Sequence, residues 1–391
     1  LVLVMIFNVV WTLLLFRGAQ VALGTFPSDG GNFASKPVGE LLDGLSENTL
    51  EWIETFGIVA HLGVILSFLL IVLYSKHAHI FLAPINVSFK RKPIALGPLL
   101  PMTSGDHLID FEDPQDDDIF GRGKIEDFTW KGLLDFSTCT ECGRCQSQCP
   151  AWNTEKPLSP KLLIMNLRDH AFAKAPYLLA EANPQYLGAS SGSTPAAPVD
   201  VQILPKKTQE ALERPLVGES ETDPHGFSFA GGVIDPDVLW SCTTCGACVN
   251  QCPVDIEHVD HIVDMRRYQN LIESAFPSEL GGLFKNLENK GNPWGMGARA
   301  RLDWAKDLPF PVKILGQDVE SADDVDYLFW VGCAGAYEDR AKKTTRAVAE
   351  LLDVAGVSFA ILGDGETCTG DSARRAGNEF LYQMLAQQNV E

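Results

Sequence analysis

The chain has 391 residues, which is long enough for two or three domains, and ten of its residues are cysteine. Its formal net charge of −20 excludes a nucleic-acid-binding protein, because affinity for nucleic acid comes mainly from Lys and Arg side chains that neutralise phosphates. A soluble acidic enzyme would be the ordinary expectation for this charge, but the amino-terminal part of the chain contradicts it.

Two apolar segments predict membrane helices. The first, residues 1–16, is shorter than the roughly 20 residues of a full span, so we expect the end of a helix whose start lies outside the sequence. A signal peptide is the alternative, but it requires a basic region before the apolar one. The second, residues 55–74, has no charged side chain and the length of a full span. Acidic residues precede it and basic ones follow (Lys76, Lys90, Arg91, Lys92), which by the positive-inside rule predicts that the rest of the chain is cytoplasmic.

Two histidines in this region are candidate haem ligands. His61 lies inside the second apolar segment, where an ionisable side chain suggests a functional site. His79 follows about five turns later at 3.6 residues per turn, so we expect both on one face of one helix, about 27 Å apart. One haem iron cannot take both ligands over that distance, but two haems could take one each. The alternatives are a hydrogen bond from His61 to a neighbouring helix and an ordinary interfacial position for His79.

An acidic segment follows the membrane region. Seven carboxylates lie within residues 106–118, and we expect residues 93–127 to form a solvated linker. Docking of a basic partner is the alternative function of these charges.

Eight cysteines form two runs of the pattern C-x2-C-x2-C-x3-C-P. In bacterial two-cluster ferredoxins, three thiolates of such a run bind one [4Fe-4S] cluster and the fourth reaches the other cluster. Gly143 and Gly246 allow the backbone to curl tightly around a cluster. Zinc sites and disulfides are the alternatives, but they do not require this doubled pattern. The predicted ligand sets are Cys139, Cys142, Cys145 and Cys252 for one cluster, and Cys149, Cys242, Cys245 and Cys248 for the other.

The residues around the two runs predict an α-helical domain over residues 128–322. Apolar spacing indicates helices at residues 161–182 and 256–278, and residues 188–200 have the composition of a flexible excursion. We therefore expect a two-cluster ferredoxin-like domain with an insertion. His258 and His261 lie near the second run, where we expect surface or supporting groups and not ligands.

The pattern changes to α/β in residues 323–391. Strands are predicted at residues 327–331 and 357–362, joined by a helix at residues 339–355. In a right-handed βαβ unit the carboxyl ends of the two strands lie side by side. Cys333 and Cys368 follow these ends, so we expect them to face a common crevice. A buried structural pair of thiols is the alternative.

These motifs together resemble the membrane-bound iron–sulfur oxidoreductases related to heterodisulfide reductase. The resemblance also rests on Gly291-Asn292-Pro293-Trp294-Gly295, on Asp303-Trp304-Ala305, and on Val331-Gly332-Cys333-Ala334 followed by Glu366-Thr367-Cys368-Thr369-Gly370. It implies a multidomain chain with transmembrane α-helices of a b-haem domain (residues 1–92), the two-cluster [4Fe-4S] domain, and an α/β Cys-Cys-Gly-type domain that is incomplete here. It also implies that His61 and His79 bind b-type haem. Cys333 and Cys368 are the candidate catalytic residues, in a crevice that we expect to dock or receive electrons from a flavoprotein and not to split a disulfide substrate.

Within that family the chain is similar to the branch that takes electrons from electron-transfer flavoprotein in fatty-acid β-oxidation and passes them to menaquinone. The partners implied are therefore that flavoprotein, menaquinone and the lipid bilayer. A heterodisulfide-reductase-like or hydroxy-acid-oxidising enzyme and a non-catalytic relay subunit are the alternatives. Thr369 stands where the family has the second cysteine of Cys-Cys-Gly, which argues against a non-cubane [4Fe-4S] cluster in this part of the chain.

Overall fold

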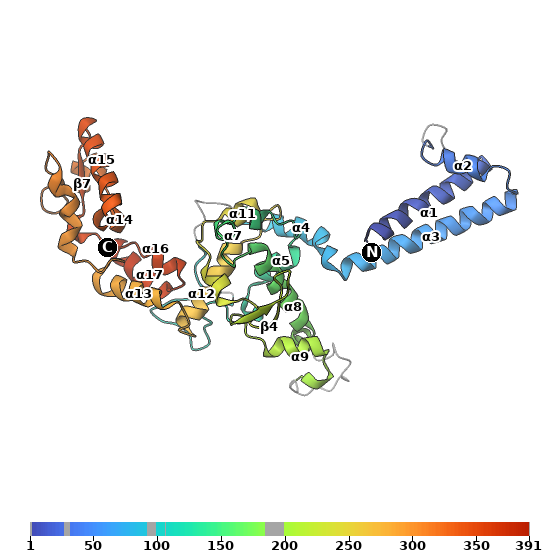
Figure 1. Ribbon diagram of the computed structural model, residues 1–391, viewed down its shortest axis with the longest axis horizontal. Helices are drawn as coiled ribbons and strands as arrows, with labels where there is room; N and C mark the ends of the chain where they lie inside the picture. Colours follow the sequence, from blue (N-terminus) through green and yellow to red (C-terminus); the bar gives the residue numbers. More distant parts are fainter. Residues whose placement is uncertain (1, 27–31, 92–98, 106, 184–198, 391) are drawn as a thin grey trace. The chain divides into compact units, whose positions relative to one another are not determined.

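The computed structural model describes residues 2–26, 32–91, 99–105, 107–183 and 199–390 (Figure 1). Its contacts divide the chain into two compact units, Leu1–Ile85 and Asn86–Glu391. Nearly all of the predicted excursion at residues 188–200 lies outside the described residues, as do Leu1, Lys92 and Asp106.

Two long helices dominate the first unit. Ser46 caps the second of them, because its hydroxyl accepts a hydrogen bond from the Thr49 amide at 3.3 Å. The two helices pack closely where Gly57 meets Phe16, since a Cβ atom at Gly57 would lie 2.7 Å from that of Phe16. The helices of this region are α1 (Val2–Leu23), α2 (Lys36–Leu42), α3 (Glu47–Leu73), the short 3-10 helix η1 (Lys76–Ala78) and α4 (His79–Ser88).

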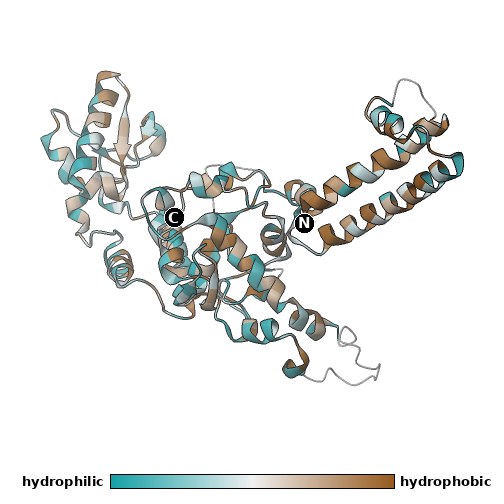
Figure 2. Ribbon diagram, turned by 45° about the vertical axis from the view of Figure 1, so that its right-hand side comes forward, coloured by the Kyte–Doolittle hydropathy of each residue, from teal (hydrophilic) through white to brown (hydrophobic). Residues whose placement is uncertain are grey.

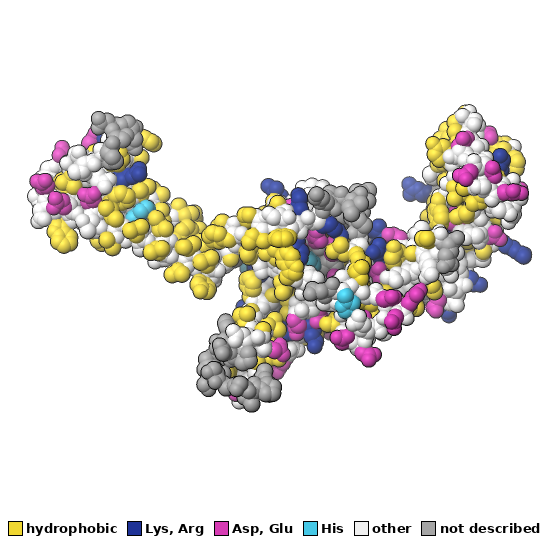
Figure 3. Space-filling view, turned by 180° about the vertical axis from the view of Figure 1, so that it is seen from behind, with side chains coloured by type: hydrophobic (Ala, Val, Ile, Leu, Met, Phe, Trp, Pro, Cys, Tyr) yellow, Lys and Arg dark blue, Asp and Glu magenta, His cyan; other side chains and the backbone are white. Residues whose placement is uncertain are grey.

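Both long helices are long and apolar enough to cross a membrane. Apolar residues run along their whole length (Figure 2), and hydrophobic side chains cover their surface (Figure 3). Helix α1 continues past the predicted end at residue 16 and reaches 22 residues, so it has the length of a span without further residues. The polar Gln20 is tolerated within it because its amide donates to Glu54 of α3 at 2.8 Å.

The structure corrects the predicted continuous helix between His61 and His79. Helix α3 ends at Leu73, and Ser75 has an extended backbone. The Ser75 hydroxyl accepts a hydrogen bond from the His77 amide at 3.3 Å, which starts a new turn instead of continuing the old one. His79 is then the first residue of α4. The two histidines therefore lie on different helices, and the five-turn spacing does not place them on one face.

The predicted linker is packed against the second unit over its described residues. Met102, Ile109 and Ile125 are buried, and the Arg122 amide donates to the Asp264 carbonyl at 3.0 Å. Ile109 lies among the carboxylates of residues 106–118, and the other two buried side chains flank them, so the average acidity of the segment did not reveal that it is packed. The strands β1 (Thr103–Ser104) and β2 (His107–Leu108) form a short antiparallel pair here.

Helices form most of the cysteine-run region. The predicted helix at residues 161–182 is α8, whereas the one predicted at 256–278 ends early, at Leu271. Ser274 has a positive φ of 50°, and Pro277 precedes the next helix, so the chain turns at this point. The elements are η2 (Ile125–Asp127), α5 (Trp130–Thr138), α6 (Arg144–Ser147), α7 (Pro150–Asn153), α8 (Pro160–Ala182), η4 (Val201–Ile203), α9 (Lys206–Glu213), β3 (Ser220–Thr222), β4 (Ser228–Gly231), α10 (Pro236–Trp240), α11 (Ala247–Gln251), α12 (His258–Leu271), α13 (Ser278–Lys290) and η5 (Ala298–Asp307).

A small parallel sheet lies in the carboxyl-terminal part, in the strand order β5-β7-β6. Its first strand lies before residue 323, so the sheet extends beyond the predicted α/β segment. Strand β6 is shorter than predicted, because Glu366 accepts the amide hydrogens of Val331 and Gly332 that a strand neighbour would otherwise accept. The elements are β5 (Lys313–Ile314), η6 (Ala322–Asp324), β6 (Tyr327–Leu328), α14 (Gly332–Tyr337), α15 (Asp339–Val354), β7 (Phe359–Ile361), η7 (Gly363–Gly365), α16 (Asp371–Arg375) and α17 (Glu379–Val390).

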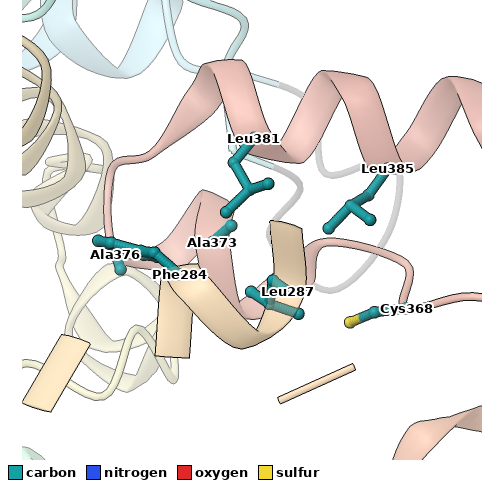
Figure 4. Packing of buried hydrophobic residues seen from close by; sticks show 7 residues of the cluster. All are labelled: Phe284, Leu287, Cys368, Ala373, Ala376, Leu381 and Leu385. Carbon is teal, nitrogen blue, oxygen red and sulfur yellow. The ribbon is translucent and has the colours of Figure 1, made fainter. Parts of the chain in front are cut away.

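The carboxyl-terminal helices pack on both α13 and α12. A buried apolar cluster joins α13, α16 and α17, and Cys368 belongs to it beside Leu287 and Leu385 (Figure 4). Gly377 lies so close to α12 that a Cβ atom there would be 2.5 Å from the backbone of Arg266. Arg267 of α12 and Glu379 of α17 form a buried ion pair at 2.9 Å. The cysteine runs and the α/β part are therefore one packed unit.

Candidate iron–sulfur and thiol sites

The two cysteine runs share one backbone conformation. Gly143 and Gly246 have φ values of 78° and 76°, in the left-handed region, and each precedes a short helix. Glu141 and Thr244, at the equivalent position two residues earlier, are also left-handed, with φ values of 57° and 55°. This repeated curl turns the first three thiols of each run toward one space.

Each curl is completed by the fourth cysteine of the other run. The structure groups the eight thiols as the spacing predicts, around two separate spaces. The first space, of about 270 Å³, is lined by Cys139, Cys142, Cys145 and Cys252, together with Val254, Ile256 and His258. The second, of about 300 Å³, is lined by Cys149, Cys242, Cys245 and Cys248, together with Leu158, Val259 and Ile262.

This arrangement fits [4Fe-4S] clusters. A cubane takes one thiolate on each of four irons, so its ligands must surround a space. A zinc ion holds sulfurs at about 2.3 Å from one point. The donor set and its spacing therefore favour a cluster over zinc.

Five of the eight ligand thiols are biased toward their protonated form when no cluster is bound. Burial, followed by the neighbouring thiols Cys139 and Cys252, raises the pKa of Cys145 to about 12. Burial also raises the pKa of Cys139, Cys242, Cys248 and Cys252. Because clusters bind thiolates, loading either site must release protons.

The two thiol sets are neighbours. Cys145 of the first and Cys248 of the second belong to one buried cluster with Val259 and Val263 of α12. Buried apolar side chains therefore join the two sets.

The histidines near the second run are buried structural groups and not surface groups. His261 bonds through Nε2 to Asp135 at 2.9 Å, and Asp135 also accepts from Lys131 at 2.6 Å and from Asn86 at 2.8 Å. Burial opposes the charge on Asp135, but the hydrogen bond and charge of His261, with Lys131, hold its pKa below the usual range. Burial, followed by His261, lowers the pKa of His258 to about 4, so this ring is neutral at pH 7.

Cys333 and Cys368 meet at a third site, in the α/β part. The side chains are close enough for Cys333 to donate a hydrogen bond to Cys368. Gly291 ties both residues to the end of α13, since its carbonyl accepts from the Cys368 amide at 2.8 Å and lies 3.9 Å from the Cys333 sulfur. A buried Arg301 donates to the Cys333 sulfur at 3.2 Å and to Glu366 at 2.6 Å.

One negative charge on this thiol pair is stabilised. The hydrogen bond from Cys333 is the largest influence on Cys368; with Arg301 and the Gly370 amide it outweighs burial and lowers the pKa of Cys368 to about 6. The same hydrogen bond, with burial, raises the pKa of Cys333. At pH 7 the pair therefore shares one proton and carries one thiolate, which is the nucleophilic form of cysteine.

Two thiols do not suffice for an iron–sulfur cluster, which usually takes four. Thr369 replaces the next cysteine, so the described residues at this site do not fit a non-cubane cluster. Sequence reasoning missed Arg301, because a lone arginine between the cluster runs and the α/β part carries no motif. Glu366 was visible only as part of the quoted Glu366-Thr367-Cys368 segment.

Comparison with known proteins agrees with this division into sites. A 4Fe-4S dicluster domain matches residues 138–257, and a cysteine-rich domain matches residues 327–391. The chain is 40% identical to the probable iron–sulfur-binding oxidoreductase FadF of Bacillus subtilis, over 84% of this chain and 44% of that protein. It is 37% identical to the EtfAB:quinone oxidoreductase of Syntrophomonas wolfei, over 85% of this chain and 42% of that protein.

The similarity extends to methanogenic archaea. One subunit of the dihydromethanophenazine:CoB–CoM heterodisulfide reductase of Methanosarcina acetivorans is 27% identical over 66% of this chain and 52% of that protein. The chain spans less than half the length of the two bacterial relatives. No solved structure matches it.

The dicluster domain, the cysteine-rich domain and these relatives define the class as an iron–sulfur oxidoreductase. The chain belongs to the family of iron–sulfur oxidoreductases related to heterodisulfide reductase.

Proposed function

We propose that this chain relays single electrons from reduced electron-transfer flavoprotein, through two [4Fe-4S] clusters and b-type haem, to menaquinone in the membrane. The observation that carries the proposal is the pair of adjacent four-thiol sets, each completed by the last cysteine of the other run. The name of one relative, EtfAB:quinone oxidoreductase, supports the choice of flavoprotein and quinone.

The residues of this chain would hold and insulate the clusters. When bound, [4Fe-4S] clusters carry one electron at a time. The left-handed turns at Gly143 and Gly246 shape the sites, and apolar side chains such as Ile256 and Ile262 exclude water from them. Contact between Cys145 and Cys248 in one apolar cluster keeps the two sites adjacent, as transfer between them requires.

Two membrane spans would anchor the relay beside its acceptor. Helices α1 and α3 have the required length and hydropathy. The basic residues after α3 support a cytoplasmic position for the cluster region by the positive-inside rule. Two of them are also fixed in ion pairs, Lys90 with Asp255 at 3.3 Å and Arg91 with Asp260 at 3.1 Å.

The environment of His61 supports a role as haem ligand. Thr12 of α1 donates its hydroxyl hydrogen to the Asn8 carbonyl at 2.7 Å, and the same oxygen lies 3.0 Å from Nδ1 of His61. The hydroxyl can therefore accept from Nδ1–H, which would leave the Nε2 lone pair for iron. A hydrogen bond to the other ring nitrogen is usual for a ligating histidine. His79 remains the candidate ligand of a second haem, although it lies on another helix.

Replacing His61 with Ala in the full-length protein should remove a b-haem signal from the reduced-minus-oxidised spectrum. Thr12→Val is the matched variant: it removes the hydrogen bond but not the ligand, so it should weaken haem retention without abolishing it. His79→Ala should remove only a second haem. A haem spectrum that is unchanged in His61→Ala would show that His61 serves only in packing against α1.

A second candidate function is reduction of a disulfide at Cys333 and Cys368, favoured by the thiolate that this pair stabilises. The test compares quinone reduction by reduced electron-transfer flavoprotein with reduction of low-molecular-weight disulfides, in the parent and in Cys368→Ser. We expect the parent to reduce quinone and not the disulfide. Cys368→Ser should slow quinone reduction by about tenfold, or about 1.4 kcal/mol, by disturbing the crevice. If the parent reduces disulfides, Cys368→Ser abolishes this, and the flavoprotein never donates, the second candidate is correct.

A further inference from the structure

Arg266 is a buried cation with no carboxylate partner among the described residues. Its guanidinium carbon lies 5.0 Å from the centre of the Trp240 ring at the end of α10, and the exposed fraction of the residue is 4%. Its guanidinium donates only to carbonyl oxygens: those of Leu239 and Cys242, each at 2.8 Å, and that of Arg375 at 3.0 Å. Its Nε atom is buried without a hydrogen-bond partner. Burying an unpaired charge costs folding free energy, so this arrangement needs an anion that the described side chains do not provide.

Two other buried arginines in the same region have carboxylate partners, which Arg266 lacks among the described residues. Arg267, next along α12, binds Asp264 at 2.7 Å and Glu379 at 2.9 Å. Arg168, near the first thiol set, binds Glu141 and Asp169, each at 2.9 Å. The lack of a carboxylate at Arg266 is therefore specific to the second thiol set and is not a general property of buried arginines in this unit.

With a cluster bound, the thiolates of the second set would be the anions within reach of Arg266. The guanidinium bonds directly to the Cys242 carbonyl, and its positive charge acts on the Cys242 thiol. Among the described residues, Arg266 beside the second set has no carboxylate partner, whereas Arg168 beside the first set forms ion pairs with Glu141 and Asp169. The two sites thus differ in local charge although their backbones are alike.

We propose that Arg266 is the countercharge of the second cluster and holds its reduction potential above that of the first. This inference rests on the proposed pair of [4Fe-4S] clusters. Reduction adds one negative charge to a site that would already carry four thiolates, and a buried cation without a carboxylate partner favours that charge. Arg168 gives the first cluster no such advantage, because Glu141 and Asp169 cancel its charge.

The position of Arg266 gives this asymmetry a direction. The guanidinium joins the loop of the second run to the end of α16, through the Arg375 carbonyl. Arg375 in turn donates to the Thr244 hydroxyl at 2.7 Å, within the second run. The second cluster would therefore be the one beside the cysteine-rich domain. With the higher reduction potential, it would also be the cluster of the pair that holds a single electron.

Redox titration of the full-length protein, followed by electron paramagnetic resonance, tests the proposal. Cys245→Ser, which changes an exposed ligand of the second set, marks the step that belongs to the second cluster. Arg266→Gln should lower the reduction equilibrium constant of that step about tenfold, or about 59 mV for one electron, and leave the other step in place. Arg266→Lys keeps the charge and changes the hydrogen bonds, so it should stay near the parent value.

Two results would overturn the proposal: an unchanged second step in Arg266→Gln, or an equal shift in Arg266→Lys, which would assign the effect to hydrogen bonds. If Arg266→Gln does not retain its clusters, Thr243→Glu replaces it, because Thr243 is exposed and lines the same space. The added carboxylate should lower the same step, and no shift would again overturn the proposal. Iron content and two redox steps in the parent test the proposed clusters separately from the role of Arg266.

Discussion

Replacing Cys252 with Ser should remove the cluster of the first run, although Cys252 belongs to the second. Anaerobically purified protein should contain about eight iron atoms at the cubane sites, and the variant about four. The reason is the crossed grouping of the thiols, in which Cys252 lies with Cys139, Cys142 and Cys145. Cysteine alkylation followed by peptide mass spectrometry identifies which thiols have become free.

The matched variant is Cys149→Ser, which should lose the other cluster and free Cys242, Cys245 and Cys248 instead. Each variant is thus the control for the other, since both remove the last cysteine of a run. If Cys252→Ser freed the other thiols of its own run, and Cys139, Cys142 and Cys145 stayed protected, the crossed grouping would be wrong.

The thiol pair in the α/β part should react with alkylating reagents at an unusually low pH. A thiol is inert when protonated, so alkylation rises as the pH increases through its pKa. With the pKa of Cys368 lowered to about 6 by the hydrogen bond from Cys333, the midpoint should lie near pH 6. Cys333→Ala removes the donor and should move the midpoint upward by about 2.5 pH units, toward an ordinary cysteine at about 8.5 or beyond. The measurement is the rate at each pH, normalised to its plateau.

Cys333→Ser is the control for that experiment, because the hydroxyl retains a donor to the remaining thiolate. Its midpoint should stay closer to the parent than to Cys333→Ala. Normalised midpoints are compared because a thiolate of lower pKa is also a weaker nucleophile, and the two effects largely cancel in the absolute rate. An identical midpoint in Cys333→Ala and the parent would contradict a shared proton between the two sulfurs.

The stability of the cluster-free protein should decrease as the pH rises. Burial raises the pKa of Cys145 and of its neighbours in the cluster-free protein, so folding disfavours their thiolates. Stability of that form is then fully present below about pH 8.5, the ordinary thiol pKa, and declines as the pH rises from there toward about 12, the pKa of Cys145 in the folded protein. Bound clusters remove this dependence, because their ligands are deprotonated already.

The sequence by itself determined the cysteine chemistry and the apolar spans. A run of C-x2-C-x2-C-x3-C-P needs one local backbone curl, and residues close in sequence can form it without help from the rest of the fold. The left-handed Gly143 and Gly246 carry out that local requirement. The span at residues 55–74 was equally visible, because hydropathy over 20 residues is a property of composition.

Only the tertiary structure showed where a predicted helix is interrupted, which acidic segment is packed, and which buried charged side chains have partners. The break after Leu73 depends on a serine that bonds to the next turn, and periodicity extended past it would not reveal the break. The acidic segment before Arg122 is packed because a few of its apolar side chains, such as Ile109, are buried, and the Arg122 amide bonds to the backbone of α12.

Arg301 and Arg266 are likewise invisible as motifs. Each acquires its role from partners far along the chain, Glu366 and Cys333 for the first and Arg375 for the second. Local sequence can specify a ligand. Whether that ligand is buried, and whether a countercharge lies beside it, is decided only when distant segments pack together. The reason is that electrostatic free energy depends on distance in space and on the exclusion of water.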